Sequence, residues 1–283
     1  MTPYQQRYGT EIPDPLALPN DFISSLLARG SIQKFTGAPL ESGVLELLIA
    51  AAQSAPTSGM LQTWSVIALS TPEEKSRLFA DTGLTPSNST IIGGVDSSNF
   101  TAINSASVVL IWLADLSRIE TILEKSDVSD RHRAQITRAE YHLKAIIDAT
   151  IAAQTFYMAA ESMGIAGTYC GAIRQLPITF FETEFNLPKH TFPVFGTIHG
   201  YSKSAPLIKP RLPADLVLHR GSYSKMQDTD QLAEYNKVHV KHSSKLRSTF
   251  EKRVIERLSP SYSKDAVGDA LRHMGFDLSL IHI

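Results

Sequence analysis

Continuous apolar runs and helically spaced apolar positions alternate along this chain, and together they predict its secondary structure. A short apolar run bounded by polar or turn residues is typical of a strand that is buried on both faces. Such runs predict strands at residues 64–69, 107–113, 168–173 and 193–201. Because helical segments separate these runs, the pattern indicates a mixed α/β or α+β layer protein.

Two segments place apolar residues every three or four positions, which is the spacing of a helix with one face in the core. The first runs over residues 39–55 and is ended by Pro56, and the second runs over residues 140–163 and is ended by Gly164. In the second helix, apolar and small residues cover more than one face. This helix needs more than one partner surface, which predicts a homodimer.

Turn and capping residues define the remaining segments. The tetrapeptide TPEE at Thr71 has the N-cap, first-turn proline and capping box that begin a helix. The polar segments 116–138 and 231–283 are predicted to be mainly helical. Residues 83–104 are rich in Gly, Ser, Thr and Asn and predict a loop, and residues 1–20 contain four prolines and predict an extended arm.

Composition excludes several classes of protein. The chain has 283 residues, 43% of them hydrophobic, so it can bury a sizeable core. Its 27 Lys and Arg against 28 Asp and Glu give a formal net charge of -1, so we expect no binding to nucleic acid or to a membrane surface. No apolar run reaches the roughly 18 residues of a membrane span. The single cysteine, Cys170, cannot form an intrachain disulfide, which predicts a cytoplasmic protein.

Familiar catalytic and metal-binding patterns are absent. The sequence has no P-loop and no GxGxxG, HExxH or GxSxG pattern. Its nine histidines are scattered, so no metal site is predicted. Cys170 has no cationic neighbours in sequence, which favours a buried, unreactive thiol over a nucleophile. These absences narrow the reactions that the chain can catalyse.

Four separated segments are rich in small hydroxyl residues, glycine or cationic side chains, at residues 29–35, 55–62, 169–174 and 209–213. Together with the helix that contains residues 148–164, they resemble the nitroreductase-like FMN flavoproteins. The most similar group is that of the oxygen-insensitive NADPH nitroreductases and flavin reductases, whose KPRLP element is intact at residues 209–213. The resemblance covers residues 26–223.

The resemblance implies an α+β fold with a central, mainly antiparallel sheet flanked by helices and a helical C-terminal extension. The expected parts are an N-terminal arm at residues 1–20, an FMN-binding domain at residues 21–225 and the extension at residues 226–283. The family builds its flavin sites at a subunit interface, so the resemblance also implies a homodimer.

The resemblance further implies which residues bind FMN, whose phosphate needs cations, whose ribityl chain needs hydroxyl and amide partners, and whose ring responds to donors near N1 and N5. The phosphate would be bound by Arg29, Gly30, Ser31, Gln33, Lys209 and Arg211. The ribityl chain and ring edge would be bound by Thr57, Ser58, Gly59 and Gln62, and the ring by Cys170, Gly171 and Ala172. NADPH recognition would involve Lys241 in the basic stretch after KPRLP.

The residues themselves leave plainer alternatives open. Lys209 and Arg211 are two apart, which puts both side chains on one face of an extended stretch, but the pair also suits a solvated basic turn. Gly171 would let its backbone N–H approach flavin N5, or it could serve tight packing against the preceding helix. Thr57 and Ser58 are also common in turns that follow a helix.

Two positions depart from the family pattern. Members usually carry an Arg-Ser-x-Arg phosphate site, and here Gly30 and Gln33 stand in place of the two arginines. Charge-assisted hydrogen bonds are worth roughly 1.5 to 3 kcal/mol each, so the departure predicts weakened FMN binding. Arg29 and Lys34 could compensate from neighbouring positions, although a lysine lacks the planar fork of an arginine.

The expected function is an FMN-dependent oxidoreductase that takes hydride from NADPH or NADH and passes it to a small aromatic acceptor such as a nitroaromatic, a quinone or a flavin, in ping-pong order. The flavin supplies the chemistry, so no catalytic side chain is named. The alternative is a non-catalytic dimer of the same fold that has lost tight FMN binding and acts as a flavin-responsive or protein-binding module.

Overall fold

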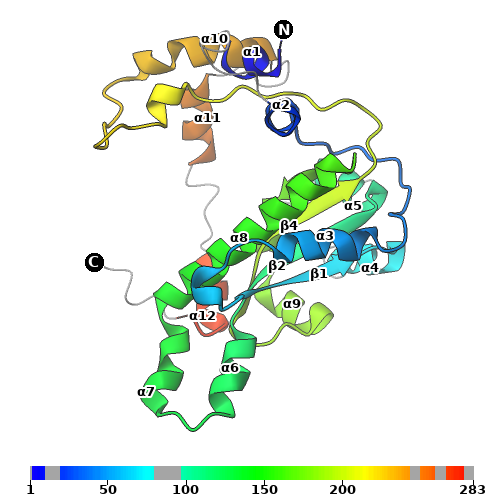
Figure 1. Ribbon diagram of the computed structural model, residues 1–283, viewed down its shortest axis with the longest axis vertical. Coiled ribbons are helices and arrows are strands. Elements are labelled where there is room, and N and C mark those ends of the chain that lie inside the picture. The colour runs from blue at the N-terminus through cyan, green and yellow to red at the C-terminus, as the bar shows by residue number, and fades with distance from the viewer. Residues whose placement is uncertain (1, 10–19, 80–96, 243–248, 259–265, 277–283) are drawn as a thin grey trace. The chain divides into compact units, whose positions relative to one another are not determined.

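The computed structural model describes residues 2–9, 20–79, 97–242, 249–258 and 266–276. The chain divides into two compact units, each assembled from two separate stretches of sequence (Figure 1). Unit 1 combines Met1–Gly30 with Ala205–Lys264, and unit 2 combines Ser31–Ser204 with Asp265–Ile283.

Unit 2 is built on a four-stranded sheet in which every neighbouring pair is antiparallel, in the order β1-β2-β4-β3. The strands are β1 (Trp64–Leu69), β2 (Val108–Asp115), β3 (Ala166–Cys170) and β4 (Thr191–Gly200). Every residue of the two central strands, β2 and β4, is buried, as their continuous apolar runs predict. Register places Ile111 opposite Ile67 on one side and Gly196 on the other. The α+β class with a central antiparallel sheet is confirmed.

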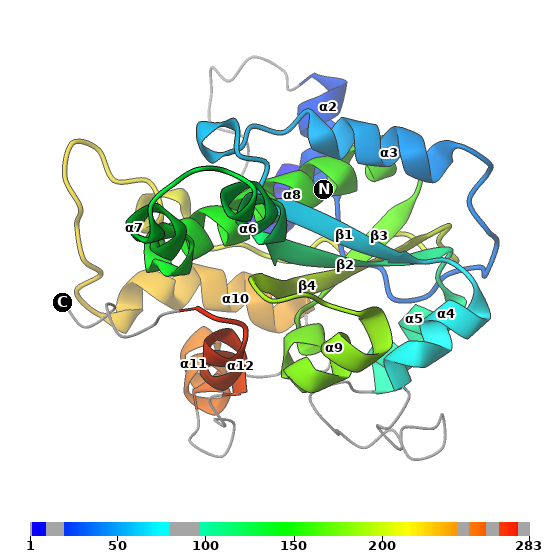
Figure 2. The same ribbon diagram turned by 90° about the horizontal axis from the view of Figure 1, so that it is seen from below.

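Helices cover both faces of this sheet, as Figure 2 shows. The long helix α8 (Ala139–Ser162) and helix α3 (Val44–Gln53) lie on one face. Helix α9 (Ile178–Phe185) lies on the other. Nine residues of α8 are buried, and Gly164, with φ of 75°, follows its end in the left-handed region that glycine tolerates.

Shorter helices complete unit 2, and most of them follow the sequence signals. Thr71 accepts from the backbone N–H of Glu74, and the Glu74 side chain bonds back to Thr71, so the predicted capping box is present. The short helices are α4 (Pro72–Ser76), α5 (Ser97–Ser105), α6 (Ser117–Glu124), α7 (Asp130–Arg133) and α12 (Ala266–His273). Helix α12 comes from the end of the chain, and the Met274 and Phe276 side chains that follow it are buried in the core of unit 2.

Unit 1 is helical, with α1 (Pro3–Tyr8), α2 (Asp21–Ala28), α10 (Ala233–His242) and α11 (Phe250–Arg257). The prediction of an extended arm at residues 1–20 is wrong for α1. Thr2 and Gln5 form a capping box, Pro3 occupies the first turn, and Gly9 closes the helix with φ of 73°. Residues 10–19 lie outside the described part of the chain.

Two further predictions need correction. The prediction of a loop at residues 83–104 is wrong for its last part, where helix α5 begins at Ser97. Ala102 and Ile103 of this helix are buried in the core. Residues 83–96 lie outside the described residues. The strand expected at residues 168–173 ends at Cys170, because the chain turns into a short 3₁₀ helix at Gly171–Gln175. Among the described residues, no helix is long and apolar enough to cross a membrane.

Candidate functional site

The segment that follows α3 forms a strained loop in unit 2. Backbone φ is 60° at Gly59, 57° at Met60 and 53° at Gln62, so three of four consecutive residues are left-handed. Glycine adopts this region without penalty, whereas the other two residues pay a steric cost. Strained backbone of this kind persists where the surroundings fix it and is enriched at ligand sites.

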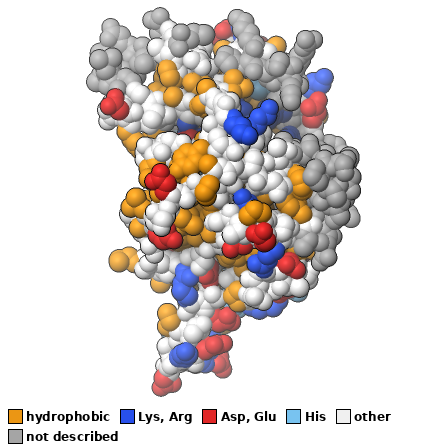
Figure 3. Space-filling model, turned by 90° about the vertical axis from the view of Figure 1, so that its right-hand side faces the viewer, with side chains coloured by type: hydrophobic (Ala, Val, Ile, Leu, Met, Phe, Trp, Pro, Cys, Tyr) orange, Lys and Arg blue, Asp and Glu red, His pale blue; other side chains and the backbone are white. Residues whose placement is uncertain are grey.

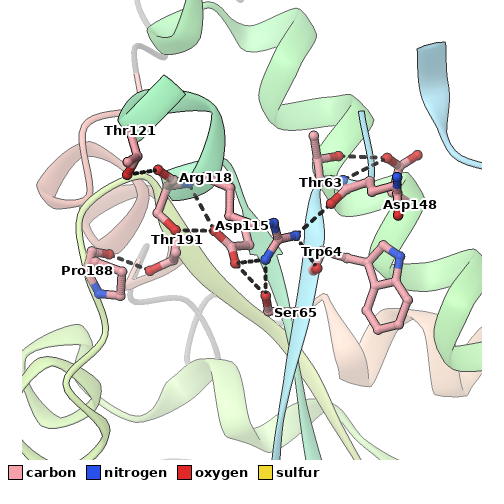
Figure 4. A network of polar contacts seen from close by, with 11 residues as sticks. Thr63, Trp64, Ser65, Asp115, Arg118, Thr121, Asp148, Pro188 and Thr191 are labelled. Carbon is pink, nitrogen blue, oxygen red and sulfur yellow. Dashed lines mark hydrogen bonds and ion pairs between the residues drawn. The ribbon is translucent and has the colours of Figure 1, made fainter. Parts of the chain in front are cut away.

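A buried carboxylate holds both ends of this loop, and Figure 4 shows its bonds to Thr63 at the C-terminal end. Asp148 of α8 is 1% exposed, and its Oδ1 accepts from the Ser58 N–H at 2.9 Å. Its Oδ2 accepts from the Thr63 hydroxyl at 2.7 Å and from the Thr63 N–H at 3.4 Å. An ionised carboxylate only accepts hydrogen bonds, so this set of three donors suits it. The long helix therefore fixes the loop from inside the core.

An arginine holds the C-terminal end of the loop from the opposite side (Figure 4). Arg118 of α6 donates from Nη2 to the carbonyl oxygens of Gln62 and Trp64, each at 2.7 Å. Its Nη1 lies 3.0 Å from Oδ2 of Asp115, the last residue of β2. Asp115 is 6% exposed and also accepts from the Ser65 hydroxyl. Hydrogen bonds to a charged group are stronger than those between neutral groups. Arg118 at one end and Asp148 at both ends therefore anchor the loop firmly.

A cavity of about 820 Å³ opens beside the loop. Its walls combine apolar side chains with a few polar groups, which is the usual character of a small-molecule site. The apolar lining is Ile49, Ala55, Pro56, Met60, Leu61, Trp64, Ile119 and Ile122, and the polar lining is Gln53, Thr57, Gln62, Ser65 and Arg118. Both Thr57 and Gln62 of the sequence prediction face this cavity.

Cys170 is the last residue of β3, and Gly171 and Ala172 begin the 3₁₀ turn that follows it. A Cβ placed on Gly171 would meet no atom closer than Arg174 Nη2, at 3.5 Å, so packing does not require a glycine there. This excludes tight packing as the reason for Gly171 and leaves an open approach to its backbone. Cys170 is only 2% exposed, which confirms the prediction of a buried cysteine.

The segment Ser31 to Phe35 runs in extended form beside β3. The Ile32 N–H donates to the Gly167 carbonyl at 2.9 Å, and Ile32 and Phe35 are buried. Ser31, which precedes Ile32, and Gln33, which follows it, are exposed. Both predicted phosphate residues of this segment are therefore accessible in unit 2.

The KPRLP stretch lies in unit 1 and is also extended. Ile208 and Pro210 are buried, whereas Lys209 and Arg211 are exposed, so the two cations share one face as predicted. Arg211 folds back and donates from Nη1 to the carbonyls of Lys209 at 3.2 Å and of Pro210 at 3.0 Å. This stretch presents two cationic side chains on a single surface.

Gly30 departs from the family pattern for a steric reason. A Cβ at this position would lie 2.4 Å from the carbonyl oxygen of Leu207 and 3.0 Å from Pro206 Cβ. Real Cβ atoms do not approach backbone so closely, so no arginine fits here without moving the chain. The glycine brings the end of α2, capped by Arg29, against the stretch that leads into Lys209.

Arg7 was not identified from the sequence, although it bonds both to the end of α2 and to the KPRLP stretch. Arg7 of α1 is 5% exposed and donates to carbonyl oxygens of the α2 end and of Lys209. The capping-box pattern TPYQ at Thr2, with proline in the first turn, was the signal that could have identified its helix.

The predicted site residues thus fall into two sets. Unit 1 contains Arg29, Gly30, Lys209 and Arg211, and it brings the two segments that carry them together. Unit 2 contains Ser31, Gln33, the Thr57–Gln62 loop and the Cys170–Ala172 turn. Lys241 belongs to α10, and its side chain lies outside the described residues. The described residues contain no group of three side chains that could hold a metal ion.

Comparison with known proteins identifies the class of this molecule. The Nitroreductase family matches residues 26–201, and the C-terminal domain of the Nitroreductase family matches residues 209–279. The chain therefore belongs to the nitroreductase family, and the family resemblance of its motifs is confirmed.

Particular relatives share most of their length with this chain. It is 32% identical to the oxygen-insensitive NADPH nitroreductase of Salmonella typhimurium, over 75% of this chain and 81% of the relative. It is 30% identical to the FMN reductase (NAD(P)H) of Bacillus subtilis, over 90% and 96%. The crystal structure of nitroreductase A from Vibrio parahaemolyticus superimposes with a TM-score of 0.75 at 28% identity, over 91% of this chain and 98% of that one. The chain is thus an oxidoreductase of this family.

Proposed function

We propose that this protein is an FMN-dependent oxidoreductase that oxidises NADPH or NADH and reduces a flat aromatic acceptor, such as a nitroaromatic, a quinone or a flavin. The observation that carries the proposal is the extent of the match to the FMN reductase of Bacillus subtilis, 30% identity over 90% of this chain. The cavity beside a strained, doubly anchored loop gives the proposal a physical basis in this molecule.

Each of the two units, taken by itself, offers residues that suit a part of FMN. Lys209 and Arg211 present two cations on one surface, which suits a phosphate. The Ser58 hydroxyl and the Gln62 amide side chain make no hydrogen bond to the described residues, so both are available to a ribityl chain or ring edge. The open backbone at Gly171 suits close approach of a planar ring.

The bound flavin would supply the redox chemistry by taking a hydride from the nicotinamide and giving it to the acceptor. The chain's own residues would bind, orient and exclude water. The Thr57–Gln62 loop and the Gly171 turn would fix the ring edge, and the apolar wall of the cavity would hold flat molecules against it. Because reductant and acceptor would use the same exposed ring face, one must leave before the other binds, which gives ping-pong order.

We also propose that the protein works as a homodimer. Leu143, Ile147 and Ile151 are 56%, 42% and 37% exposed and follow one another every four residues on α8. Helix α3, which packs on α8, exposes Leu47 at 59%. Figure 3 shows hydrophobic side chains gathered in patches on the visible face. A second copy of this chain is the occupant that would cover the α8 stripe, since an apolar stripe of one helix is suited to a self-complementary contact.

Purified protein tests the proposed function directly. The enzyme should be yellow, or become yellow with added FMN, and should oxidise NADPH only when an acceptor is present. Initial rates at several acceptor concentrations should give parallel double-reciprocal lines, as ping-pong order requires. A colourless protein that stays inactive with FMN would contradict the proposal and favour a non-catalytic member of the fold, which the departures at Gly30 and Gln33 would then explain. A single cysteine fits a reducing compartment, and we propose that the protein is cytoplasmic.

A further inference from the structure

We propose that Arg7, from the N-terminal helix α1, is a positioning residue of the flavin phosphate site. It would fix the backbone at Arg29 and at Lys209, in two segments distant in sequence, and would add its own positive charge to the site. The proposal rests on the proposed function, because it takes the phosphate to be that of FMN. It also gives a role to the N-terminal segment and to the absence of the two family arginines.

The Arg7 guanidinium joins two parts of unit 1 that lie about 200 residues apart in sequence. Its Nε donates to the Leu27 carbonyl at 2.6 Å, and its Nη2 donates to the Arg29 carbonyl at 2.6 Å and the Leu26 carbonyl at 3.4 Å. Its Nη1 donates to the Lys209 carbonyl at 3.3 Å. A single side chain therefore binds the end of α2 and the KPRLP stretch at once.

The backbone around Arg7 adds two further contacts between the same segments. The Arg211 N–H donates to the Arg7 carbonyl at 3.0 Å. Gly30 lies so close to Leu207 that a Cβ would be 2.4 Å from its carbonyl oxygen. The positions of Arg29, Lys209 and Arg211 relative to one another are therefore fixed by direct bonds. Only arginine has the planar fork of five donors that can serve four carbonyls in this way.

Charge makes this arrangement a site for an anion. An arginine keeps its charge when buried, and carbonyl oxygens satisfy its N–H groups without neutralising it. The Lys209 carbonyl oxygen accepts from Nη1 of Arg7 at 3.3 Å and from Nη1 of Arg211 at 3.2 Å, so the two guanidinium groups meet at one oxygen. Neither Lys209 nor Arg211 forms an ion pair with the described residues. Like charges held close together are unfavourable unless an anion lies among them. A phosphate monoester supplies that anion, and its oxygens pair well with such cations.

This arrangement offers a replacement for the missing arginines. No side chain fits at Gly30, and Gln33 carries no charge. Arg7 restores one positive charge to the cluster of unit 1, from a helix that the family motifs do not include. We expect FMN to bind through Lys209, Arg211 and Arg29, with Arg7 acting through them and not as a direct ligand.

The test compares FMN with riboflavin, which has the same ring and ribityl chain but no phosphate. Arg7→Gln in the full chain should raise the Kd for FMN by about tenfold or more, because the segments that carry Arg29, Lys209 and Arg211 lose the side chain that joins them. The Kd for riboflavin should change by less than about twofold, since riboflavin makes no phosphate contact. Fluorescence titration of the apoprotein measures both constants. Arg7→Lys keeps the charge but loses the fork, so it should give an intermediate Kd for FMN.

A matched control is Arg133→Gln. Arg133 also donates to backbone carbonyls, those of Leu123 and Ser126, but it lies in α7 of unit 2 and contacts none of the predicted flavin residues. This variant should bind FMN and riboflavin as the wild type does. If Arg7→Gln does not fold, as judged by circular dichroism, the Arg7→Lys protein carries the comparison.

Each outcome decides the proposal. Equal weakening of FMN and riboflavin would show that Arg7 is merely structural, and unchanged FMN binding would also overturn the inference. If the wild type binds neither flavin, the proposed function fails, and inorganic pyrophosphate then serves as the probe. A rise in Tm with pyrophosphate in the wild type, reduced in Arg7→Gln and retained in Arg133→Gln, would support an anion site positioned by Arg7. No such rise in the wild type would overturn it.

Discussion

The hydroxyl of Thr63 donates to the buried Asp148 carboxylate at 2.7 Å, and this one bond links a core helix to the strained loop. Thr63→Val keeps the shape of the side chain but leaves Asp148 with one donor fewer, which should cost about 1 to 3 kcal/mol. Because the loop then loses part of its anchor, FMN binding should weaken as well. Thr63→Ser keeps the hydroxyl and should behave nearly as the wild type.

Urea denaturation and FMN titration of the two variants provide the measurement. Thr197→Val is a suitable control, since Thr197 is also fully buried and accepts a bond from the Trp112 indole N–H at 2.9 Å, without contact to the loop. It should lose stability while keeping its FMN affinity. If Thr63→Val keeps full affinity for FMN, the anchoring of the loop is irrelevant to the cofactor.

The buried side chain of His199 makes the free energy of unfolding depend on pH. It is fully buried beside Phe156 and Tyr157, and burial lowers its pKa from 6.5 to about 3. Above pH 6.5 the imidazole is neutral in both the folded and the unfolded chain. Below that value the unfolded chain takes up a proton that the folded chain refuses, so stability falls as the pH drops from 6.5 towards 3.

The expected slope from this one proton is about 1.4 kcal/mol per pH unit. His199→Leu removes the titrating group, so its free energy of unfolding should fall less steeply over this window than that of the wild type. Denaturant unfolding at a series of pH values measures both proteins, and equal slopes for His199→Leu and wild type would contradict the assignment.

At the scale of elements, the apolar stripe of α8 sets the expected oligomeric state. Ile147 lies in the middle of the stripe and is 42% exposed. A lysine there would bury a charge in the proposed dimer contact at a cost of several kcal/mol, whereas the isolated chain would tolerate it. Ile147→Lys should therefore sediment as a monomer at micromolar concentration, while the wild type sediments as a dimer.

Ile255→Lys provides the comparison, because Ile255 is 72% exposed on α11 of unit 1, which is not part of the stripe. It should remain dimeric. A wild type that sediments as a monomer would contradict the dimer, and a dimeric Ile147→Lys would place the contact on another surface.

Elements with a continuous local pattern were predictable from sequence, and those that depend on distant partners were not. Strand β1 spans the predicted residues 64–69, because one apolar run defines it. Helix α5 has a polar sequence typical of a loop, yet it forms because Phe100 packs on Phe79, with ring centroids 4.5 Å apart, and Ala102 and Ile103 fill the core. Helix α1 was hidden by the prolines around it, although its capping box is local.

The same contrast between local patterns and distant contacts applies to the candidate site. The motif residues could be identified from their resemblance to a family, and their roles towards FMN stay predictions. The Asp148 anchor and the contact from Arg7 to Lys209 could not be found, because they join residues that are 90 and 202 positions apart. Nor could sequence show that Leu207 leaves no room for a side chain at Gly30, since the contact depends on how the backbone folds.

At the scale of the whole molecule, the end of the chain completes the core of unit 2. Phe276 is 2% exposed and packs on His142, with ring centroids 3.7 Å apart, and the His190 N–H donates to the Met274 carbonyl. Phe276→Ala should therefore destabilise the protein by about 3 to 5 kcal/mol, and removal of residues 265–283 should destabilise it further.

Thermal unfolding followed by circular dichroism measures these effects. Phe276→Leu fills much of the same volume and should lose less stability than Phe276→Ala. A truncated protein with the wild-type Tm would show that α12 contributes nothing to the core.

The interleaving of the two units has a consequence for synthesis on the ribosome. Unit 1 consists of Met1–Gly30 and a second stretch that begins at Ala205, so its first stretch has no partner until residues 31–204 have been translated. At about 5–20 residues per second, this takes on the order of ten seconds or more. Unit 2 in turn lacks its last stretch until residues 265–283 have been translated. Neither unit can close as it leaves the exit tunnel. A nascent chain of this protein therefore keeps apolar surface uncovered throughout elongation, and a chain released early exposes an unfinished core to chaperones and proteases.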